Sequence, residues 1–132
     1  MANHSVKYAT PAQANAMLPE VLPLIDRMMK VYQAAKLVET VQIAFESDQQ
    51  TYTQQIRQQK ELHRLWLEIY ELIDKLADKG IVVKDMATGL IDWYAQRGGE
   101  DIFLCFRFGE TRVKFWHKHA AGFQGRHAIS WV

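Results

Sequence analysis

The spacing of hydrophobic residues changes at Gly80, and this change constrains the fold more than any other feature of the sequence. Before Gly80, apolar side chains recur every three or four residues, which places them on one face of a helix. After Gly80 they recur at every second residue, which is the spacing of one face of a β-strand. A helical half followed by a stranded half predicts an α+β fold.

The first helix signal is a possible capping box at Thr10 and Gln13, with Pro11 at the first helical position. A proline disfavours helical backbone at the residue before it, so Pro19 predicts a turn at that point. We therefore expect a short helix that ends near Met17 and precedes the longer helices.

Two long helices are predicted to form an antiparallel hairpin. The first covers 20–45, and a polar connection at 46–53 offers Ser47 and Asp48 as caps for the next. The second helix ends at Gly80, which is expected to adopt the left-handed conformation common after a helix. A short link between long helices makes them antiparallel neighbours.

The stranded half predicts a small antiparallel β-meander of three to four strands, packed by one face on the hairpin. The runs with strand periodicity are 81–83, 90–95, 102–108 and 112–118. In the third run, Ile102 and Leu104 share the face expected to contact the helices, while Phe103, Cys105 and Arg107 share the other. We expect polar chemistry on that second face. The chain is expected to form one domain, 1–132, with the hairpin at about 10–79 and the meander and C-terminal loop at about 80–132.

Charge, hydropathy and cysteine content disfavour several classes of protein. The chain has 132 residues and a net charge of +1, which does not favour nucleic acid as a partner. No apolar run is long enough to predict a membrane span. A single cysteine cannot form an internal disulfide, and the N-terminus lacks the pattern of a signal peptide, so a cytoplasmic location is expected.

Several motifs resemble a known family. They are VKD at 83–85, GLIDW at 89–93, LCF at 104–106, GE at 109–110, WH at 116–117 and GFQGR at 122–126, with TP at 10–11 and ANAMLPE at 14–20 upstream. Together they are similar to an uncharacterised prokaryotic family, domain of unknown function 2203. The chain departs from its usual pattern at Trp93 and Tyr94, where Phe-Pro is common, and at Phe106, which is often Trp. The resemblance implies a small cytoplasmic bacterial or archaeal protein and brings no activity with it.

Polar residues of the stranded half are candidates for a ligand or metal site. The candidate ligand site contains Asp85, Asp92, Arg107, Glu110, His117 and Arg126. Nitrogen and oxygen ligands for a divalent metal are expected from His117, His119 and Glu110, because the two histidines project from the same side of one strand. The alternative is structural, since such residues also cap turns and pair with one another.

Two further hypotheses concern the cysteine and the C-terminal loop. Cys105 is a candidate nucleophile with His117 as its base, although a cysteine in the middle of a strand is more typically buried and inert. The glycines around Phe123, followed by Arg126, suit a small anionic ligand. A turn that ends in a packed arginine is the structural alternative.

Three functional classes remain open at this stage. The leading hypothesis is a binding or adaptor module that self-associates as a homodimer through residues between Val31 and Trp66, because the hairpin has more apolar positions than one small sheet can cover. The second is a small metal-assisted or acid/base enzyme that uses Asp85, Asp92, Glu110 and His117. The third is an RNA-associated factor, which the near-zero net charge disfavours.

Overall fold

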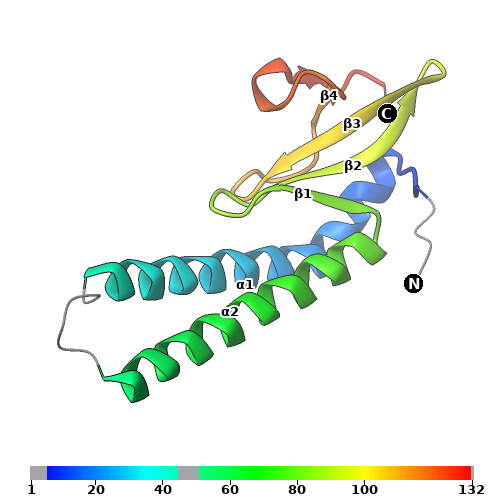
Figure 1. Cartoon of the computed structure of the whole chain (residues 1–132). Helices are drawn as coiled ribbons and strands as arrows, with labels where there is room; N and C mark the ends of the chain where they lie inside the picture. The colour runs from blue at the N-terminus through cyan, green and yellow to red at the C-terminus, as the bar shows by residue number, and fades with distance from the viewer. Residues whose placement is uncertain (1–5, 45–50, 132) are drawn as a thin grey trace.

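The computed structural model describes the backbone of residues 6–44 and 51–131, with side chains over the same ranges except 42–44. Its helices are α1 (Pro11–Ala44) and α2 (Tyr52–Asp78), with a 3-10 turn, η1 (Phe123–Gly125). Its strands are β1 (Ile81–Asp85), β2 (Leu90–Arg97), β3 (Glu100–Arg107), β4 (Phe115–Lys118) and β5 (His127–Ala128). The two helices form a hairpin, and the sheet lies across one end of it (Figure 1). The predicted α+β class is confirmed.

The predicted short helix and turn before Pro19 are wrong, because α1 is a single helix of 34 residues with Pro19 and Pro23 inside it. Both prolines are exposed, and their spacing of four places them on the same solvent side. Water can therefore bond the carbonyls that they leave without helical donors. On the opposite side Leu18, Val21 and Ile25 form an unbroken buried stripe, and its packing outweighs the local preference.

Replacing Pro19 with alanine should stabilise the protein. The change restores one helical hydrogen bond at an exposed position, but it also makes the unfolded chain more flexible, which opposes the gain. We expect a net rise of about 1–2 kcal/mol in the free energy of unfolding. Urea unfolding followed by circular dichroism measures this. Pro11→Ala is the comparison: Pro11 is buried and stands at the first helical position, where no bond is gained, so its replacement should not stabilise the protein. Equal destabilisation by both changes would contradict this account of α1.

Each end of α2 follows from local chemistry. Thr51 is the N-cap, and its hydroxyl accepts from the Gln54 backbone N–H while the Gln54 side chain accepts from the Thr51 N–H. The predicted caps Ser47 and Asp48 lie outside the described residues. Gly80 follows the helix with φ +83°, as predicted, and a Cβ there would lie 3.0 Å from the Lys7 Cβ.

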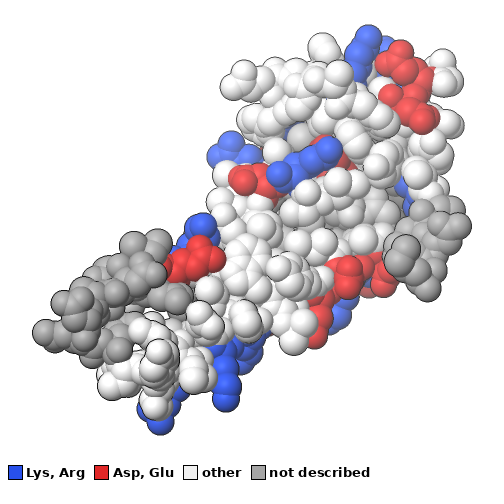
Figure 2. Space-filling model, in the orientation of Figure 1, with Lys and Arg blue, Asp and Glu red and all other residues white. Residues whose placement is uncertain are grey.

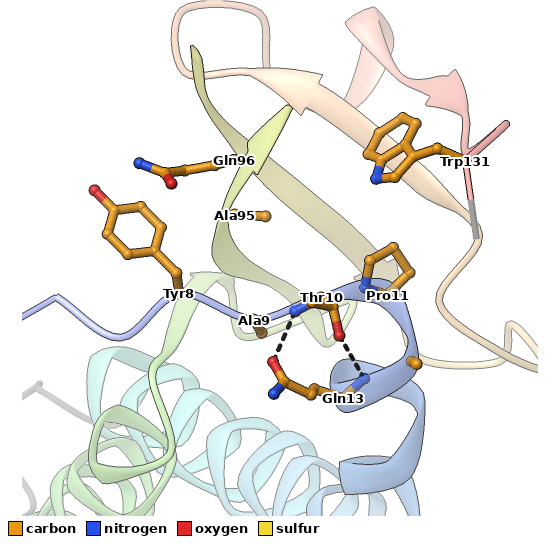
Figure 3. A pocket seen from close by; sticks show the side chains of 9 residues that line it. Tyr8, Ala9, Thr10, Pro11, Gln13, Ala95, Gln96 and Trp131 are labelled. Carbon is orange, nitrogen blue, oxygen red and sulfur yellow. Dashed lines mark hydrogen bonds between the residues drawn. The ribbon is translucent and has the colours of Figure 1, made fainter. Parts of the chain in front are cut away.

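The start of α1 is joined to the sheet by side chains. Thr10 and Gln13 form the predicted reciprocal capping pair, shown by the two dashed lines in Figure 3. Asn15, one turn further, accepts from the Val113 N–H at 2.7 Å and donates to the Val113 carbonyl at 3.0 Å. The first turn of the helix is thereby held against the segment that leads into β4.

The sheet is an antiparallel meander in the order β1-β2-β3-β4-β5. It has five strands, whereas three to four were predicted. The additional strand, β5, is two residues long and pairs with β4, and a stretch this short shows no periodicity in the sequence. Within the described residues, no helix is long and apolar enough to cross a membrane.

The hydrophobic core lies between the first face of the sheet and the near half of the hairpin. Its members come from both helices and from the central strands; they include Leu18, Val21, Ile25, Met28, Leu72, Leu76, Ile91, Trp93, Leu104 and Phe106. The far half of the hairpin projects past the sheet (Figure 1) and has its own small cluster of Val31, Ala35, Leu65 and Ile69. One face of the sheet is thus occupied by the helices, and the other faces away from them.

Candidate functional site

Three adjacent strands bring a carboxylate, a thiol and an imidazole together on the second face of the sheet. Asp92 of β2 lies opposite Cys105 of β3, and His117 of β4 lies opposite Phe103, the residue two before Cys105. Side chains that are opposite or diagonal on one face are within reach of each other. The exposed fractions of Asp92, Cys105 and His117 are 1%, 1% and 2%. We call these three residues the polar cluster.

The polar cluster is compact. His117 Nε2 lies 3.0 Å from Asp92 Oδ2, and one ligand atom from each of the three residues lies within 4.8 Å of the others. Across the part of the chain that the structure describes, this is the group of His, Cys, Asp or Glu side chains close enough to hold a metal ion. Asp92 Oδ1 is buried and accepts no N–H or O–H hydrogen bond from the described residues, and the Cys105 thiol, a weak donor, is the other hydrogen-bonding group at this carboxyl.

The backbone fixes the state of the imidazole ring. His117 Nδ1 lies 2.7 Å from the Lys118 carbonyl, which can only accept, so Nδ1 carries a proton and donates it. The second nitrogen, Nε2, is the one bonded to Asp92 Oδ2. Both ring nitrogens are therefore occupied, and neither is available to take a proton from the Cys105 thiol.

Burial governs the charge of Asp92. Loss of water raises the pKa of this carboxyl, while His117, Cys105 and Lys84 act in the opposite direction. Lys84 Nζ lies 4.0 Å from Asp92 Oδ2 and 4.4 Å from the centre of the Phe103 ring. An ammonium group that rests on an aromatic face thus stands beside the buried acid.

Cys105 is a neutral thiol in this environment. Burial, followed by the nearby Asp92 carboxylate, raises its pKa to about 12. A thiolate is the nucleophilic form, so this thiol is suppressed at neutral pH. Together with the occupied imidazole, this state argues against the cysteine nucleophile considered from the sequence.

The Cys105 thiol should therefore resist reagents in the native protein. At pH 8, with EDTA present to exclude stray metal, we expect labelling to be roughly a thousandfold slower than in urea, because both the thiolate fraction and access are reduced. The release of a chromophoric disulfide reagent measures the rate. Rapid native labelling would show that the second face opens readily.

Glu110 and Arg126 form a clamp beside the polar cluster. Arg126 Nη2 donates to both oxygens of Glu110 at 2.7 Å, and Glu110 Oε1 accepts from the Arg107 backbone N–H at 2.7 Å. The Arg126 guanidinium also lies 4.0 Å from the centre of the Phe115 ring. The clamp ties the turn after β3 to the segment after η1, which covers this side of the sheet.

The remaining predicted site residues have separate partners. Asp85 Oδ2 accepts from the Thr88 N–H at 3.1 Å and caps the turn between β1 and β2. The Arg107 guanidinium lies over the Phe123 ring at 5.5 Å. His119 is exposed and stacks on Phe103 at 4.2 Å. Of the expected metal ligands, His117 belongs to the polar cluster, whereas Glu110 is engaged by Arg126 and His119 lies on the aromatic surface.

A separate hollow of about 440 Å³ lies where the N-terminal segment meets β2. Tyr8 and Trp131 stand on opposite sides of it, with Ala95 between them (Figure 3). None of its lining side chains is charged, and Thr10 and Gln13 already bond each other. The lining of the hollow contains no acidic, basic or metal-binding side chain, so the polar cluster is the stronger candidate for a functional site.

The sequence profile of an uncharacterized conserved protein family, DUF2203, matches residues 7–129. The chain belongs to this family. The resemblance noted in the sequence is thus confirmed, and the matched range contains all three residues of the polar cluster. No curated protein and no solved structure matches the chain significantly. The description of DUF2203 names no activity, so the polar cluster is the main indication of function in this chain.

Cys105 is the member of the polar cluster that the predicted site omitted. From the sequence, Cys105 was a candidate nucleophile, but its apolar strand neighbours Leu104 and Phe106 favoured an inert core residue. Strand alternation already placed it on the second face. The strand register that places Cys105 opposite Asp92 was not predicted.

Proposed function

We propose that this protein is a metal-binding module in which Asp92, Cys105 and His117 hold a divalent transition-metal ion, with Zn²⁺ the best match. The observation that carries the proposal is the buried polar cluster itself, with its ligand atoms within 4.8 Å and with Asp92 Oδ1 accepting no N–H or O–H hydrogen bond among the described residues. A buried carboxylate whose remaining donor is a weakly donating thiol is costly, and a bound ion is one of its ordinary explanations.

The types of ligand support zinc. Thiolate sulfur, imidazole nitrogen and carboxylate oxygen are its usual protein ligands. Ligands of one tetrahedral zinc ion lie roughly 3–4 Å from each other. The 3.0 Å between His117 Nε2 and Asp92 Oδ2, and the 4.8 Å limit for the cluster, require only small side-chain adjustments.

The tautomer of His117 also suits a ligand. Histidines that bind metal generally donate their other ring N–H to a carbonyl or carboxylate, which orients the ring. The bond from Nδ1 to the Lys118 carbonyl is of this kind and leaves Nε2 facing the cluster. The same arrangement disfavours the acid/base enzyme, because that ring has no free nitrogen to exchange protons with a substrate.

Charge balance supports the proposal as well. Metal binding deprotonates a coordinating thiol, so Zn²⁺ with the Cys105 thiolate, the Asp92 carboxylate and a neutral imidazole has no net charge. The Arg126 charge near Cys105 is already paired with Glu110. Lys84 opposes a bound cation, with its Nζ 4.0 Å from Asp92 Oδ2. Its side chain is 38% exposed, so the ammonium can turn towards solvent when an ion neutralises the acid.

Zinc and cobalt titration of chelator-treated protein tests the proposal. We expect about one zinc ion per chain in a competition assay with a chromophoric chelator. The Co²⁺ form should show a thiolate-to-metal absorption band that is absent from Cys105→Ser. Asp92→Asn should weaken binding by roughly tenfold or more, because the neutral amide is a poor ligand.

The matched control is His119→Gln, which alters an exposed residue outside the polar cluster and should retain full affinity. Lys84→Met should bind the ion more tightly, since it removes the opposing charge. Circular dichroism verifies that each variant is folded. Zinc binding that survives both Cys105→Ser and Asp92→Asn, or no binding at micromolar free zinc, would refute the proposal.

A further inference from the structure

Helix α2 has a second apolar stripe on the side opposite its core face. The residues of this outer stripe are Ile56, His63, Leu67 and Tyr70, at successive spacings of seven, four and three. Leu67 is two residues beyond the buried Leu65, about 200° around the helix. Ile56, Leu67 and Tyr70 are 52%, 57% and 58% exposed, so neither α1 nor the sheet covers them.

The outer stripe has the features of a helix-packing surface. Its spacing is that of a heptad seam, which is where one helix receives another. A groove of about 550 Å³ runs along it, lined by Leu62, His63, Trp66, Leu67 and Tyr70. Tyrosine, tryptophan and leucine side chains in such a groove are more typical of an interface than of a solvated face.

The charges of α2 are divided between its two halves. Residues 52–64 contain three basic residues and one acidic residue, whereas residues 65–78 contain one basic residue and four acidic residues. In Figure 2 the blue atoms gather towards the tip of the hairpin, beside the start of α2, and red atoms gather near its end, beside the sheet. The helix is therefore electrostatically complementary to a second copy of itself only in the antiparallel direction.

We infer that two copies of this chain associate through the outer stripes of α2, packed antiparallel about a two-fold axis between His63 and Leu67. With the axis at the middle of the stripe, Lys60 lies beside Glu71 of the partner subunit, and Arg57 lies beside Asp74 of the partner subunit. A two-fold contact uses the same surface twice, which matches a single self-complementary helix. This places the self-association expected from the sequence on the outer side of α2.

A single exposed substitution tests the outer stripe. Leu67→Glu should raise the dissociation constant of the dimer by roughly tenfold or more, measured by sedimentation equilibrium, because it places a charge in the apolar seam. Leu67 is exposed in the single chain, so the variant should fold normally. Leu37→Glu is the matched control: Leu37 is 65% exposed on α1, outside the stripe, and its change should leave the mass of the dimer unchanged.

Charge exchange tests the direction of packing. The variant Arg57→Glu/Lys60→Glu should be mainly monomeric, as should Glu71→Lys/Asp74→Lys. All four changes in one chain should restore the dimer, because each reversed half again meets its opposite in an antiparallel pair. High salt should weaken the wild-type dimer. A wild-type chain that is monomeric at 100 µM, a dimer lost in Leu37→Glu but kept in Leu67→Glu, or a fourfold variant that stays monomeric would each overturn the inference.

The test is independent of metal binding. The outer stripe and the polar cluster lie on different elements, α2 and the second face of the sheet. Leu67→Glu should therefore keep the zinc affinity of the wild type, and Cys105→Ser should keep its dimer. Failure of one proposal leaves the other to be judged on its own measurements.

Discussion

Gly89→Ala is expected to destabilise the protein by about 3–4 kcal/mol. Gly89 has φ +67°, and an added Cβ would lie 2.7 Å from the Phe108 Cβ, 2.8 Å from the Met29 Sδ and 3.0 Å from the Ile25 Cγ2. The turn before β2 is thus pressed against α1, where neighbours are packed and have little room to move. The midpoint and slope of urea unfolding, followed by tryptophan fluorescence, measure the loss.

Gly98→Ala is the control for the backbone term. Gly98 has φ +58°, close to that of Gly89, and a Cβ there has no neighbour within 4 Å. Its substitution should cost only about 1 kcal/mol, from the left-handed backbone conformation alone. The difference between the two variants isolates the close approach of the turn to α1. Equal losses of stability at both positions would mean that the close contact between this turn and α1 does not contribute to the cost of the Gly89 substitution.

The pattern of the sequence was sufficient for the overall architecture. Periodicity distinguished the hairpin from the meander, and Gly80 marked the boundary correctly. The break at Pro19 was wrong because the steric rule for proline acts locally, whereas the buried stripe through Leu18 and Ile25 acts along the whole helix. β5 was missed because its two residues are held by pairing with β4 rather than by a pattern of their own.

The candidate site was predictable in part. Alternation along β3 placed Cys105 on the face away from the helices, and Asp92 and His117 were recognised as candidates. The two-residue turn at Gly98 and Gly99 pairs Arg97 with Glu100, and counting back along both strands pairs Asp92 with Cys105. The positions of the two glycines are therefore enough to predict this register. The ion pair between Glu110 and Arg126 could not be predicted, because it depends on the path of the chain after η1.

His117→Ala is expected to be the most destabilising single change in the polar cluster, at about 3–5 kcal/mol in the presence of EDTA. Removal of the ring deprives Asp92 Oδ2 of its 3.0 Å hydrogen-bond partner, while Oδ1 accepts no N–H or O–H hydrogen bond from the described residues. A carboxylate that is 1% exposed cannot recover this loss from water. His119→Ala, at an exposed ring, should change the free energy of unfolding by only about 0.5 kcal/mol.

Replacing both partners distinguishes a structural pair from a metal site. The double variant Asp92→Leu/His117→Leu removes both members of the buried pair together, and we expect its stability to return to within about 1 kcal/mol of the wild type, since apolar side chains of similar volume often replace a buried pair without loss. Zinc binding should be abolished in the same folded protein. If instead the double variant stays as unstable as His117→Ala, the pair itself stabilises the fold, and Asp92 and His117 are retained for the fold rather than for a ligand.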